Sequence, residues 1–424
     1  MCGHIGLPGG GFGFTYHYSN GGAATSEAPA FPGISANPKG KNTGMAWEGH
    51  SVATIPLARF TDCFLNPGKT IDYNGRKITY PDIRLVFWSG GNPFAQQEDT
   101  NALVKAWKKP DTTIVCDTVW TASARMSDIV LPACTSLERN DITSIGSYSN
   151  LGYVAMQQAI EPQYESHSDF WIYSHLAEKL GHGKEFTEGL DEMGWLRRFY
   201  AQAKKESEAS GLEMPSFEEF WKAGLAKVWH YRKDPIALEA FRKDPAAHPL
   251  KTPTGKIEIY SEQLAKETAD WVIAEGDRIN AIPKFWLTWD IPGDSLQQNY
   301  PLQCFGFHGH GRIHSTFHNL PKLRSLHPDA LYMNPVDAGK RGIQDGDTVE
   351  IFNDRGIVRL PVRVTPRIMP GVVTMPQGAW YDPQMIDGRR VDVGGCINTL
   401  TAHRPSPYGK GNAQHNILVD VRKA

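Results

Sequence analysis

The 424-residue sequence lacks long apolar runs and a strong net charge, and each absence excludes a class of protein. The longest apolar runs, such as Leu85 to Trp88, are far shorter than the roughly 20 residues that a membrane-spanning helix needs. The net charge of −2 provides no broad basic surface for nucleic acid or anionic lipid. We therefore expect no direct membrane span and no nucleic-acid partner.

Several sequence motifs of catalysis and metal binding are also missing. The six cysteines are scattered without a Cys-x-x-Cys pair, which argues against a disulfide scaffold, a zinc site or a cluster within this chain. No GxSxG, HExxH or Walker sequence occurs, so acyl transfer, zinc proteolysis and P-loop phosphoryl transfer lack a motif. No basic stretch followed by an apolar one is visible in residues 1–13, so no export signal is apparent. The motifs that remain favour binding over autonomous chemistry.

What is present is an ordinary globular composition, with 40% hydrophobic and 21% charged residues, in a chain long enough for two or three domains. Strand-like runs at 83–88, 113–116 and 129–132 alternate with helix-like segments at 97–108 and within 117–127. This alternation predicts an α/β fold with part of a doubly wound parallel sheet. Residues 165–248 are rich in charge and predict helices packed outside the sheet.

The chain changes character towards its C-terminal end. Residues 255–260 alternate like a short strand, and from about residue 300 short strands and tight turns predict a compact β-barrel. Asn334-Pro335 predicts the start of a helix, and strands are expected at 348–352, 357–364 and 371–375. We therefore expect an α/β region over residues 1–290 and a C-terminal β-barrel domain over 300–424.

Three sites near glycines or strand ends could contact a ligand. Glycines 9, 10, 11 and 13 could bring backbone N–H groups onto a phosphate, or could form only a tight turn. Asn92 and Asp117 each follow a predicted strand, where open α/β sheets bind ligands. The alternatives are a simple turn at Asn92 and a helix cap at Asp117.

Four histidines gather at positions 308, 310, 314 and 318, and they admit three interpretations. Metal ligation is one, although no cysteine or carboxylate lies inside the cluster. A solvated surface loop is another. An anion or pterin site fits better, because Arg312, His314, Ser315 and Thr316 supply donors beside flexible glycines. The Gly378-Ala-Trp-Tyr sequence is either aromatic core or a lid over a flat ligand.

Taken together and in order, several segments resemble the dimethyl sulfoxide reductase family of molybdopterin oxidoreductases, over nearly the whole chain. They are His4-Ile-Gly-Leu-Pro-Gly-Gly-Gly-Phe-Gly, Phe87-Trp-Ser-Gly-Gly-Asn-Pro, Ser127-Asp-Ile-Val-Leu-Pro-Ala-Cys, Leu137-Glu-Arg-Asn-Asp, Arg312-Ile-His-Ser, Ile351-Phe-Asn-Asp-Arg-Gly and Gly378-Ala-Trp-Tyr. The resemblance implies a double-psi type of barrel that binds molybdopterin dinucleotide. It also implies two molybdopterin guanine dinucleotides holding one molybdenum, and removal of oxygen from an S-oxide or N-oxide during anaerobic respiration.

The resemblance also assigns residues to the cofactor. Glycines 9, 10 and 13 would lie near one pterin dinucleotide, and Asn92 and Asp117 would contact its nucleotide part. The pterin and pyrophosphate would be lined, and the site closed, by His308, Arg312, His314, Ser315, Thr316, Asn398, Gln414 and His415.

The departures from the family concern catalysis. Family members supply a Ser, Cys or Asp ligand to molybdenum from an N-terminal half, often with an iron–sulfur cluster, and nothing here matches that segment. We expect this chain to be the C-terminal half of a periplasmic enzyme, inactive alone, with an electron-donor protein or iron–sulfur subunit as partner. The alternative is a non-catalytic protein that binds the dinucleotide or acts as a scaffold, and a weaker alternative is an enzyme that adds oxygen to its substrate.

Overall fold

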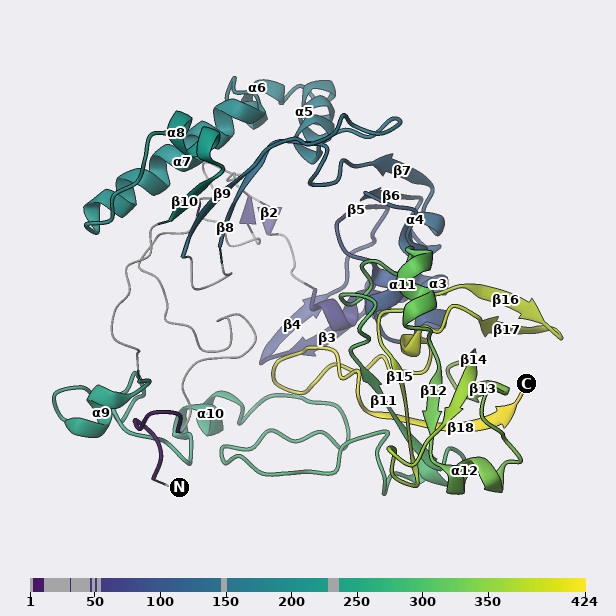
Figure 1. The fold of residues 1–424 in the computed structure, drawn as a ribbon. Helices are drawn as coiled ribbons and strands as arrows, with labels where there is room; N and C mark the ends of the chain where they lie inside the picture. The colour runs from purple at the N-terminus through teal and green to yellow at the C-terminus, as the bar shows by residue number, and fades with distance from the viewer. Residues whose placement is uncertain are drawn as a thin grey trace. The chain divides into compact units, whose positions relative to one another are not determined.

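The structure, a computed structural model, describes residues 3–10, 31, 46–47, 50–51, 55–145, 151–227 and 236–424 (Figure 1). The chain forms two compact units. Unit 1 comprises residues 1–42 and 132–259, and unit 2 comprises residues 43–131 and 260–424. Among the described residues, none of the helices combines the length and hydrophobicity that crossing a lipid bilayer requires.

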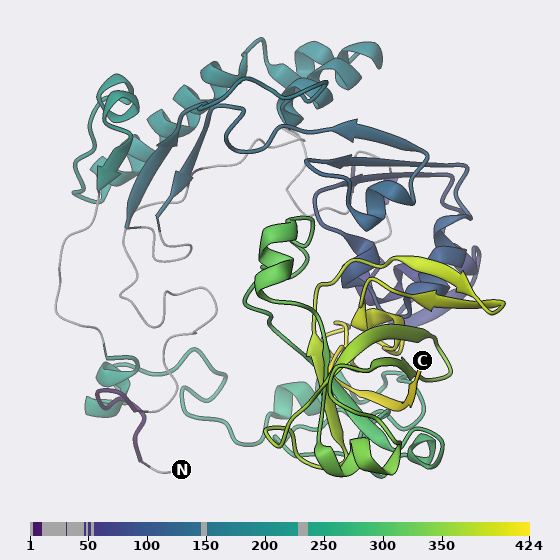
Figure 2. The ribbon, with the colours of Figure 1, turned by 45° about the vertical axis from the view of Figure 1, so that its right-hand side comes forward.

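Unit 1 is built from helices on a small antiparallel sheet. The sheet has the order β10-β9-β8, and Tyr153 on β9 pairs with Ala226 on β10. Figures 1 and 2 show α7 and α8 along one face of this sheet. The elements are β8 (Asp141–Ser144), β9 (Gly152–Met156), α5 (Asp169–Lys179), α6 (Gly183–Thr187), α7 (Glu192–Ala209), α8 (Phe217–Ala223), β10 (Leu225–Lys227) and α9 (Glu239–Lys243).

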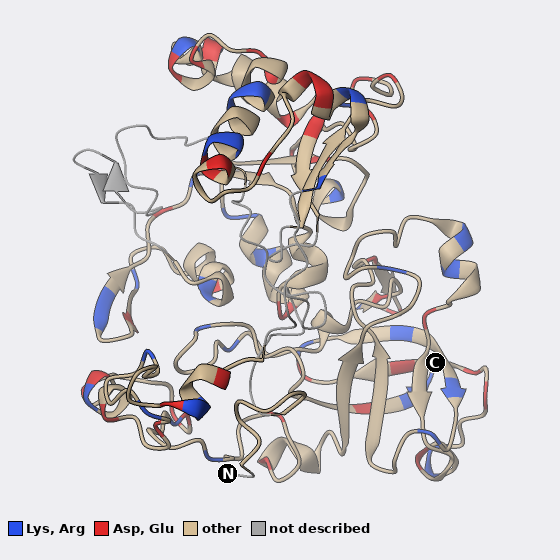
Figure 3. Cartoon of the chain, turned by 60° about the vertical axis from the view of Figure 1, so that its left-hand side comes forward, with Lys and Arg blue, Asp and Glu red and all other residues tan. Residues whose placement is uncertain are grey.

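The core of unit 1 forms because the helices and the sheet each present aromatic side chains to the other. Tyr200 of α7 stacks on Phe220 of α8 with ring centroids 4.5 Å apart, and both side chains are buried against Tyr153. A capping box fixes the start of α8, since Ser216 and Glu219 bond each other's backbone N–H. The polar faces carry interspersed charges of both signs (Figure 3).

The first part of unit 2 is an α/β layer. Its three-stranded sheet has the order β5-β6-β7, and β5 pairs with β6 in parallel, Trp88 opposite Val115. Trp107 of α3 and Phe94 of α2 pack edge to face, 5.5 Å apart. The elements are β1 (Ala46–Trp47), β2 (His50–Ser51), α1 (Phe60–Leu65), β3 (Thr70–Tyr73), β4 (Arg76–Thr79), β5 (Leu85–Ser89), α2 (Pro93–Gln96), α3 (Thr100–Trp107), β6 (Thr112–Asp117), α4 (Ala122–Arg125), β7 (Ile129–Pro132) and α10 (Glu262–Glu267).

The second part of unit 2 is a closed β-barrel of six strands. The strands run in the order β12-β15-β11-β18-β13-β14, and pairing of β12 with β14 closes the ring, which curves back on itself in Figure 2. The strands and helices are β11 (Leu302–Phe307), α11 (Pro321–Leu326), β12 (Leu331–Met333), α12 (Pro335–Lys340), β13 (Thr348–Phe352), β14 (Ile357–Val364), β15 (Val372–Pro376), β16 (Pro383–Ile386), β17 (Arg389–Asp392) and β18 (Ile417–Lys423).

Alternating apolar side chains fill the barrel, as small closed barrels require. Val349 and Ile351 of β13 are fully buried in the same cluster as Val358 of β14 and Val373 of β15. The intervening Glu350 is also buried, where Arg359, Arg389 and Arg422 bond its carboxylate. Burial alone would raise the Glu350 pKa, but these guanidinium groups lower it to about 2.

These elements test the expected fold. The α/β region with a parallel strand pair and the C-terminal barrel are confirmed. The short strand expected at 255–260 is wrong, because these residues form bends and irregular chain with no strand partner among the described residues. Ile257 and Ile259 are both more than half exposed, so their alternation does not mark a buried face. The domain division at 290–300 stays a prediction.

Candidate functional site

The candidate site is a pocket of about 380 Å³ in unit 2, called here the amide pocket. Among the residues that the structure describes, no Lys, Arg, Asp or Glu contributes to its lining, which consists of amide and imidazole side chains with small and apolar residues. The polar lining residues are Gln96, Gln97, His314, Gln377, Asn398, Asn412, Gln414 and His415. Amides both donate and accept hydrogen bonds, so the pocket suits the polar edge of a neutral ring system.

Three side chains from the C-terminal loops reach the end of α2 and the residue that follows it. Asn398 Nδ2 donates to the carbonyl of Ala95 at 3.2 Å, and Gln414 Nε2 donates to the carbonyl of Gln96 at 2.5 Å. Asn412 Nδ2 donates to Gln97 Oε1 at 3.4 Å. Asn398 is buried, whereas Gln414 is half-buried and His415 is exposed. The predicted residues Asn398, Gln414 and His415 thus share this pocket with His314.

The His314 wall of the pocket is held by close backbone packing. Gln377 Nε2 lies 3.2 Å from His314 Nδ1. A side chain on Gly378 would begin only 1.9 Å from the carbonyl oxygen of His314, so this position accepts only glycine. His314 and Phe317 have φ angles of 47° and 74°, in the left-handed region that side chains rarely adopt. Such strain clusters at ligand sites.

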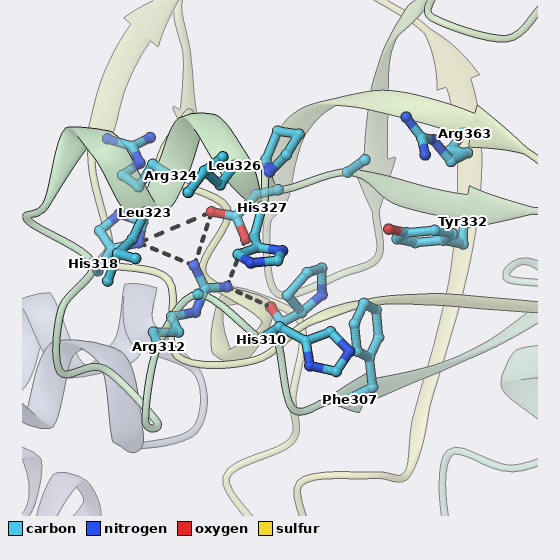
Figure 4. A pocket seen from close by; sticks show the side chains of 16 residues that line it. Phe307, His310, Arg312, His318, Leu323, Arg324, Leu326, His327, Tyr332 and Arg363 are labelled. Carbon is cyan, nitrogen blue, oxygen red and sulfur yellow. Dashed lines mark hydrogen bonds and ion pairs between the residues drawn. The ribbon is translucent and has the colours of Figure 1, made fainter.

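Arg312 points away from the amide pocket. Its guanidinium forms two bonds to the Asp329 carboxylate, at 2.6 and 2.9 Å (Figure 4). Its Nε donates to the carbonyl of Gln377 at 2.8 Å. Burial, and then the charge of Arg312, lower the pKa of His318 to about 4, so His318 is neutral and Nδ1 accepts from Arg312. Arg312 therefore braces the loop in this structure, and its contact with a cofactor stays a prediction.

The remaining residues of the histidine-rich loop have separate surroundings. His308 is exposed, with its ring 5.3 Å from that of His314. The Ser315 side chain is buried, and its carbonyl accepts from Trp380 Nε1. Thr316 is exposed in a turn with Ile313. Among the residues that the structure describes, no group of three or more His, Cys, Asp or Glu side chains could hold a metal ion.

Asn92 and Asp117 lie at the carboxyl ends of neighbouring strands, as expected. Asn92 Oδ1 accepts from the hydroxyl and the backbone N–H of Ser123, while Asn92 Nδ2 is buried without a partner among the described residues. Asp117 accepts from the backbone N–H of Thr118 and the hydroxyl of Thr121. Thr121 caps α4, so Asp117 supports that helix start. Their role at a nucleotide stays a prediction.

The glycine-rich loop belongs to unit 1. Gly9 has a φ of 68°, and a side chain on Gly10 would begin 2.7 Å from the carbonyl oxygen of His4. The backbone bond from Gly10 to Leu7 closes a tight turn. Gly13 lies outside the described residues. The described part of this loop is therefore a turn whose phosphate contact stays a prediction.

The structure decides between the two interpretations of Trp380 and Tyr381, and it adds pocket residues that the sequence did not predict. Trp380 and Tyr381 are buried in the core with Phe94, which favours aromatic packing over a lid. Gln96, Gln97, Gln377 and Asn412 line the amide pocket but were not predicted. Gln96 and Gln97 lie three and four residues after the end of the Gly-Gly-Asn-Pro motif, and that proximity was the available signal.

The amide pocket has unsatisfied hydrogen-bonding capacity. Asn412 Oδ1 is buried in its wall without a partner among the described residues. Buried polar atoms normally find partners, so this acceptor is a place for a polar ligand. The neutral donors and acceptors that line this pocket fit the ring end of a nucleotide-bearing cofactor.

Two family models match the chain. Residues 1–179 match "Molybdopterin oxidoreductase", and residues 302–418 match "Molydopterin dinucleotide binding domain". The second match covers the barrel except for most of β18, and it includes His314, Gln377, Asn398 and Asn412 of the amide pocket.

Curated relatives align over the whole chain but are longer. The dimethyl sulfoxide/trimethylamine N-oxide reductase of Cereibacter sphaeroides is 45% identical over 100% of this chain and 51% of its own length. Trimethylamine-N-oxide reductase of Haemophilus influenzae is 40% identical over 100% of this chain and 52% of its own length. Dimethyl sulfoxide reductase DmsA of Escherichia coli is 43% identical over 82% of this chain and 42% of its own length. The chain thus spans about half the length of the relatives it matches.

A solved structure shares the fold. Acetylene hydratase from Pelobacter acetylenicus superposes with a TM-score of 0.59 over 81% of this chain and 45% of that chain, at 21% sequence identity. At that identity the likeness concerns the fold alone.

Proposed function

Since this chain belongs to the dimethyl sulfoxide reductase family of molybdopterin oxidoreductases, we propose that it forms half of a molybdenum-dependent S-oxide or N-oxide reductase. The observation that carries the proposal is the amide pocket, which lies largely within the dinucleotide-binding domain and whose wall holds the buried Asn412 Oδ1, an acceptor without a partner among the described residues. When bound, the molybdenum cofactor supplies transfer of an oxygen atom together with two electrons.

This chain's residues would hold the cofactor rather than perform that transfer. Asn398, Asn412 and Gln414 would bond the edge of the dinucleotide's base, for which we propose guanine, because amides match its mixed donors and acceptors. His314 and His415 would contribute ring N–H donors to its phosphates. Burial of Asn398 would exclude water from these bonds and strengthen them.

The other parts of the enzyme are proposed on the family relationship alone. A segment outside the 424 residues would supply the Ser, Cys or Asp ligand to molybdenum, and with it the second dinucleotide site and any iron–sulfur cluster. The electron donor would be a separate protein or an iron–sulfur subunit. We place the enzyme in the periplasm, where it would serve anaerobic respiration.

The test uses the 424-residue chain produced in a host that makes molybdopterin guanine dinucleotide. Mass spectrometry of the purified chain should detect guanine nucleotide, and Asn398→Ala with Gln414→Ala should reduce its amount about tenfold or more, because each change removes a proposed hydrogen bond to the base. Asn299→Ala, an exposed position outside the pocket, is the matched control.

Activity separates the two functional classes. We expect no reduction of dimethyl sulfoxide or trimethylamine N-oxide by the loaded chain alone, and reduction once the missing half is supplied. Retention of nucleotide without activity in the completed protein would point to the non-catalytic binding protein. Wild-type chain free of guanine nucleotide would contradict the proposed site.

A further inference from the structure

A second pocket of unit 2 lies under α11 and has about 280 Å³ of volume. We call it the basic pocket, because His310, Arg324, His327 and Arg363 contribute to its lining (Figure 4). In Figure 4 His327 lies between Arg324 on one side and Arg363 on the other. The rings of His310 and His327 are 5.8 Å apart, close enough for both to reach one small group.

The charge of this pocket is uncompensated. Its one acidic lining residue, Asp329, is paired with Arg312, and both side chains are nearly inaccessible, at 10% and 6% exposure. Arg324 and Arg363 form no ion pair with any other residue that the structure describes, and both are exposed. Two free guanidinium groups therefore face the pocket beside two imidazoles, which attracts an anion.

The basic pocket is distinct from the amide pocket although the same strands build both. Phe307 of β11 lies opposite Pro376 of β15, and both line the basic pocket. Gly306 and Gln377, their direct neighbours in sequence, line the amide pocket. Successive residues of a strand point to opposite faces, so the two pockets lie on different sides of these strand ends and share no lining residue.

The size of the basic pocket limits its ligand. Ligand pockets usually have volumes of about 300 to 1,000 Å³, and this one, at about 280 Å³, lies just below that range and is too small for a dinucleotide. Phe307 and Tyr332 form an edge-to-face pair, with centroids 5.5 Å apart, along one wall. That aromatic wall would accept a small flat group beside the charged one.

We propose that the basic pocket binds a small phosphate-type oxyanion, either free or as the phosphate group of a small aromatic ester. His310 and His327 donate hydrogen bonds to the oxyanion, and Arg324 and Arg363 supply flanking positive charge. The Arg312–Asp329 pair keeps the one nearby carboxylate from repelling it. This proposal does not depend on the reductase function.

The experiment titrates the 424-residue chain by calorimetry with inorganic phosphate and with phenyl phosphate, at constant ionic strength. We expect saturable binding at one site. His310→Ala with His327→Ala, and separately Arg324→Ala with Arg363→Ala, should each weaken it about tenfold or more, since each double variant removes two charged or hydrogen-bonding contacts. Lys340→Ala with Arg367→Ala removes two exposed cations outside the pocket and should leave binding unchanged.

Each outcome decides the proposal or its ligand source. Tighter binding of phenyl phosphate identifies an aromatic ester as the ligand, and equal binding identifies the free oxyanion. The absence of saturable binding to the wild-type chain overturns the proposal, and so does equal weakening by the Lys340/Arg367 control. Thermal unfolding of every variant shows whether it is folded, and for an unfolded double variant the single changes Arg324→Ala and Arg363→Ala provide the comparison.

Discussion

The Glu98 side chain is fully buried in the connection between α2 and α3, and neither carboxyl oxygen has a partner among the described residues. Burial raises the pKa of Glu98 to about 8. Between about pH 4.3, the unfolded value, and pH 8 the folded chain therefore binds a proton that the unfolded chain has released. Stability contributed by this group is present below pH 4.3 and is lost as the pH rises towards 8.

Glu98→Gln should consequently stabilise the chain at high pH. We expect the free energy of unfolding, measured in urea at pH 8, to rise by on the order of 2 kcal/mol. The free energy of unfolding of the variant should also fall less steeply between pH 5 and 8 than that of the wild-type chain. Glu267→Gln, at an exposed position, should change neither quantity. An unchanged pH profile for Glu98→Gln would show that the carboxyl group gains a partner in solution.

Gly378 offers a test of the His314 wall of the amide pocket. In Gly378→Ala the new methyl group would overlap the carbonyl oxygen of His314, so we expect the loop to shift and guanine nucleotide retention to fall about tenfold. Gly371→Ala is a matched control, because its φ of 81° nearly equals the 82° of Gly378 but open space surrounds it. Equal losses in both variants would assign the effect to backbone strain alone.

At the scale of elements, Asn334 caps α12 of the barrel. Its Oδ1 accepts from the backbone N–H of Val336 at 2.9 Å, and Pro335 takes the first helical position. Asn334→Ala should lower the free energy of unfolding by about 1 to 2 kcal/mol, measured by urea denaturation. Asn334→Asp keeps the accepting oxygen and should recover most of that loss. If Asn334 acted only through the bond from its Nδ2 to the carbonyl of Ile368, Asn334→Asp would be as unstable as Asn334→Ala.

Local signals explain why the barrel elements could be predicted closely. Strands β13 and β14 occupy the expected 348–352 and 357–364, because Asn353-Asp-Arg-Gly marks the turn between them and β14 alternates between buried and more exposed residues. The start of α12 could likewise be predicted from two adjacent residues, the cap Asn334 and the first-turn Pro335. Parallel pairing of β5 with β6 followed from alternation of strands and helices.

Distant partners explain what could not be predicted. The sheet of unit 1 joins Tyr153 to Ala226, residues far apart in sequence, and no local pattern reveals that pairing. The reverse error occurred at 255–260, where alternation was present but no strand pairs with it among the described residues. In the site, Asn412 and Gln377 meet Gln96 and Gln97 only through the fold, whereas His314 and Asn398 were identified by family resemblance.

At the scale of the whole molecule, each unit has its own apolar core. Phe220 is fully buried in the core of unit 1, and Met375 is fully buried in the barrel of unit 2. Phe220→Ala should lower the stability of unit 1 by about 3 to 5 kcal/mol, and Met375→Ala should lower that of unit 2 by about 2 to 5 kcal/mol. Hydrogen exchange should show each loss mainly in its own unit. Equal losses of protection in both units would indicate a single cooperative structure.

The order of strands around the barrel has a consequence for synthesis. The ring places β18, residues Ile417–Lys423, between β11 and β13, so it is the last strand made and has neighbours on both sides. Until residues 417–423 have left the ribosome, β11 and β13 expose unpaired edges that can join another chain. Newly made barrels therefore depend on protection from aggregation until β18 has emerged and taken its place in the ring.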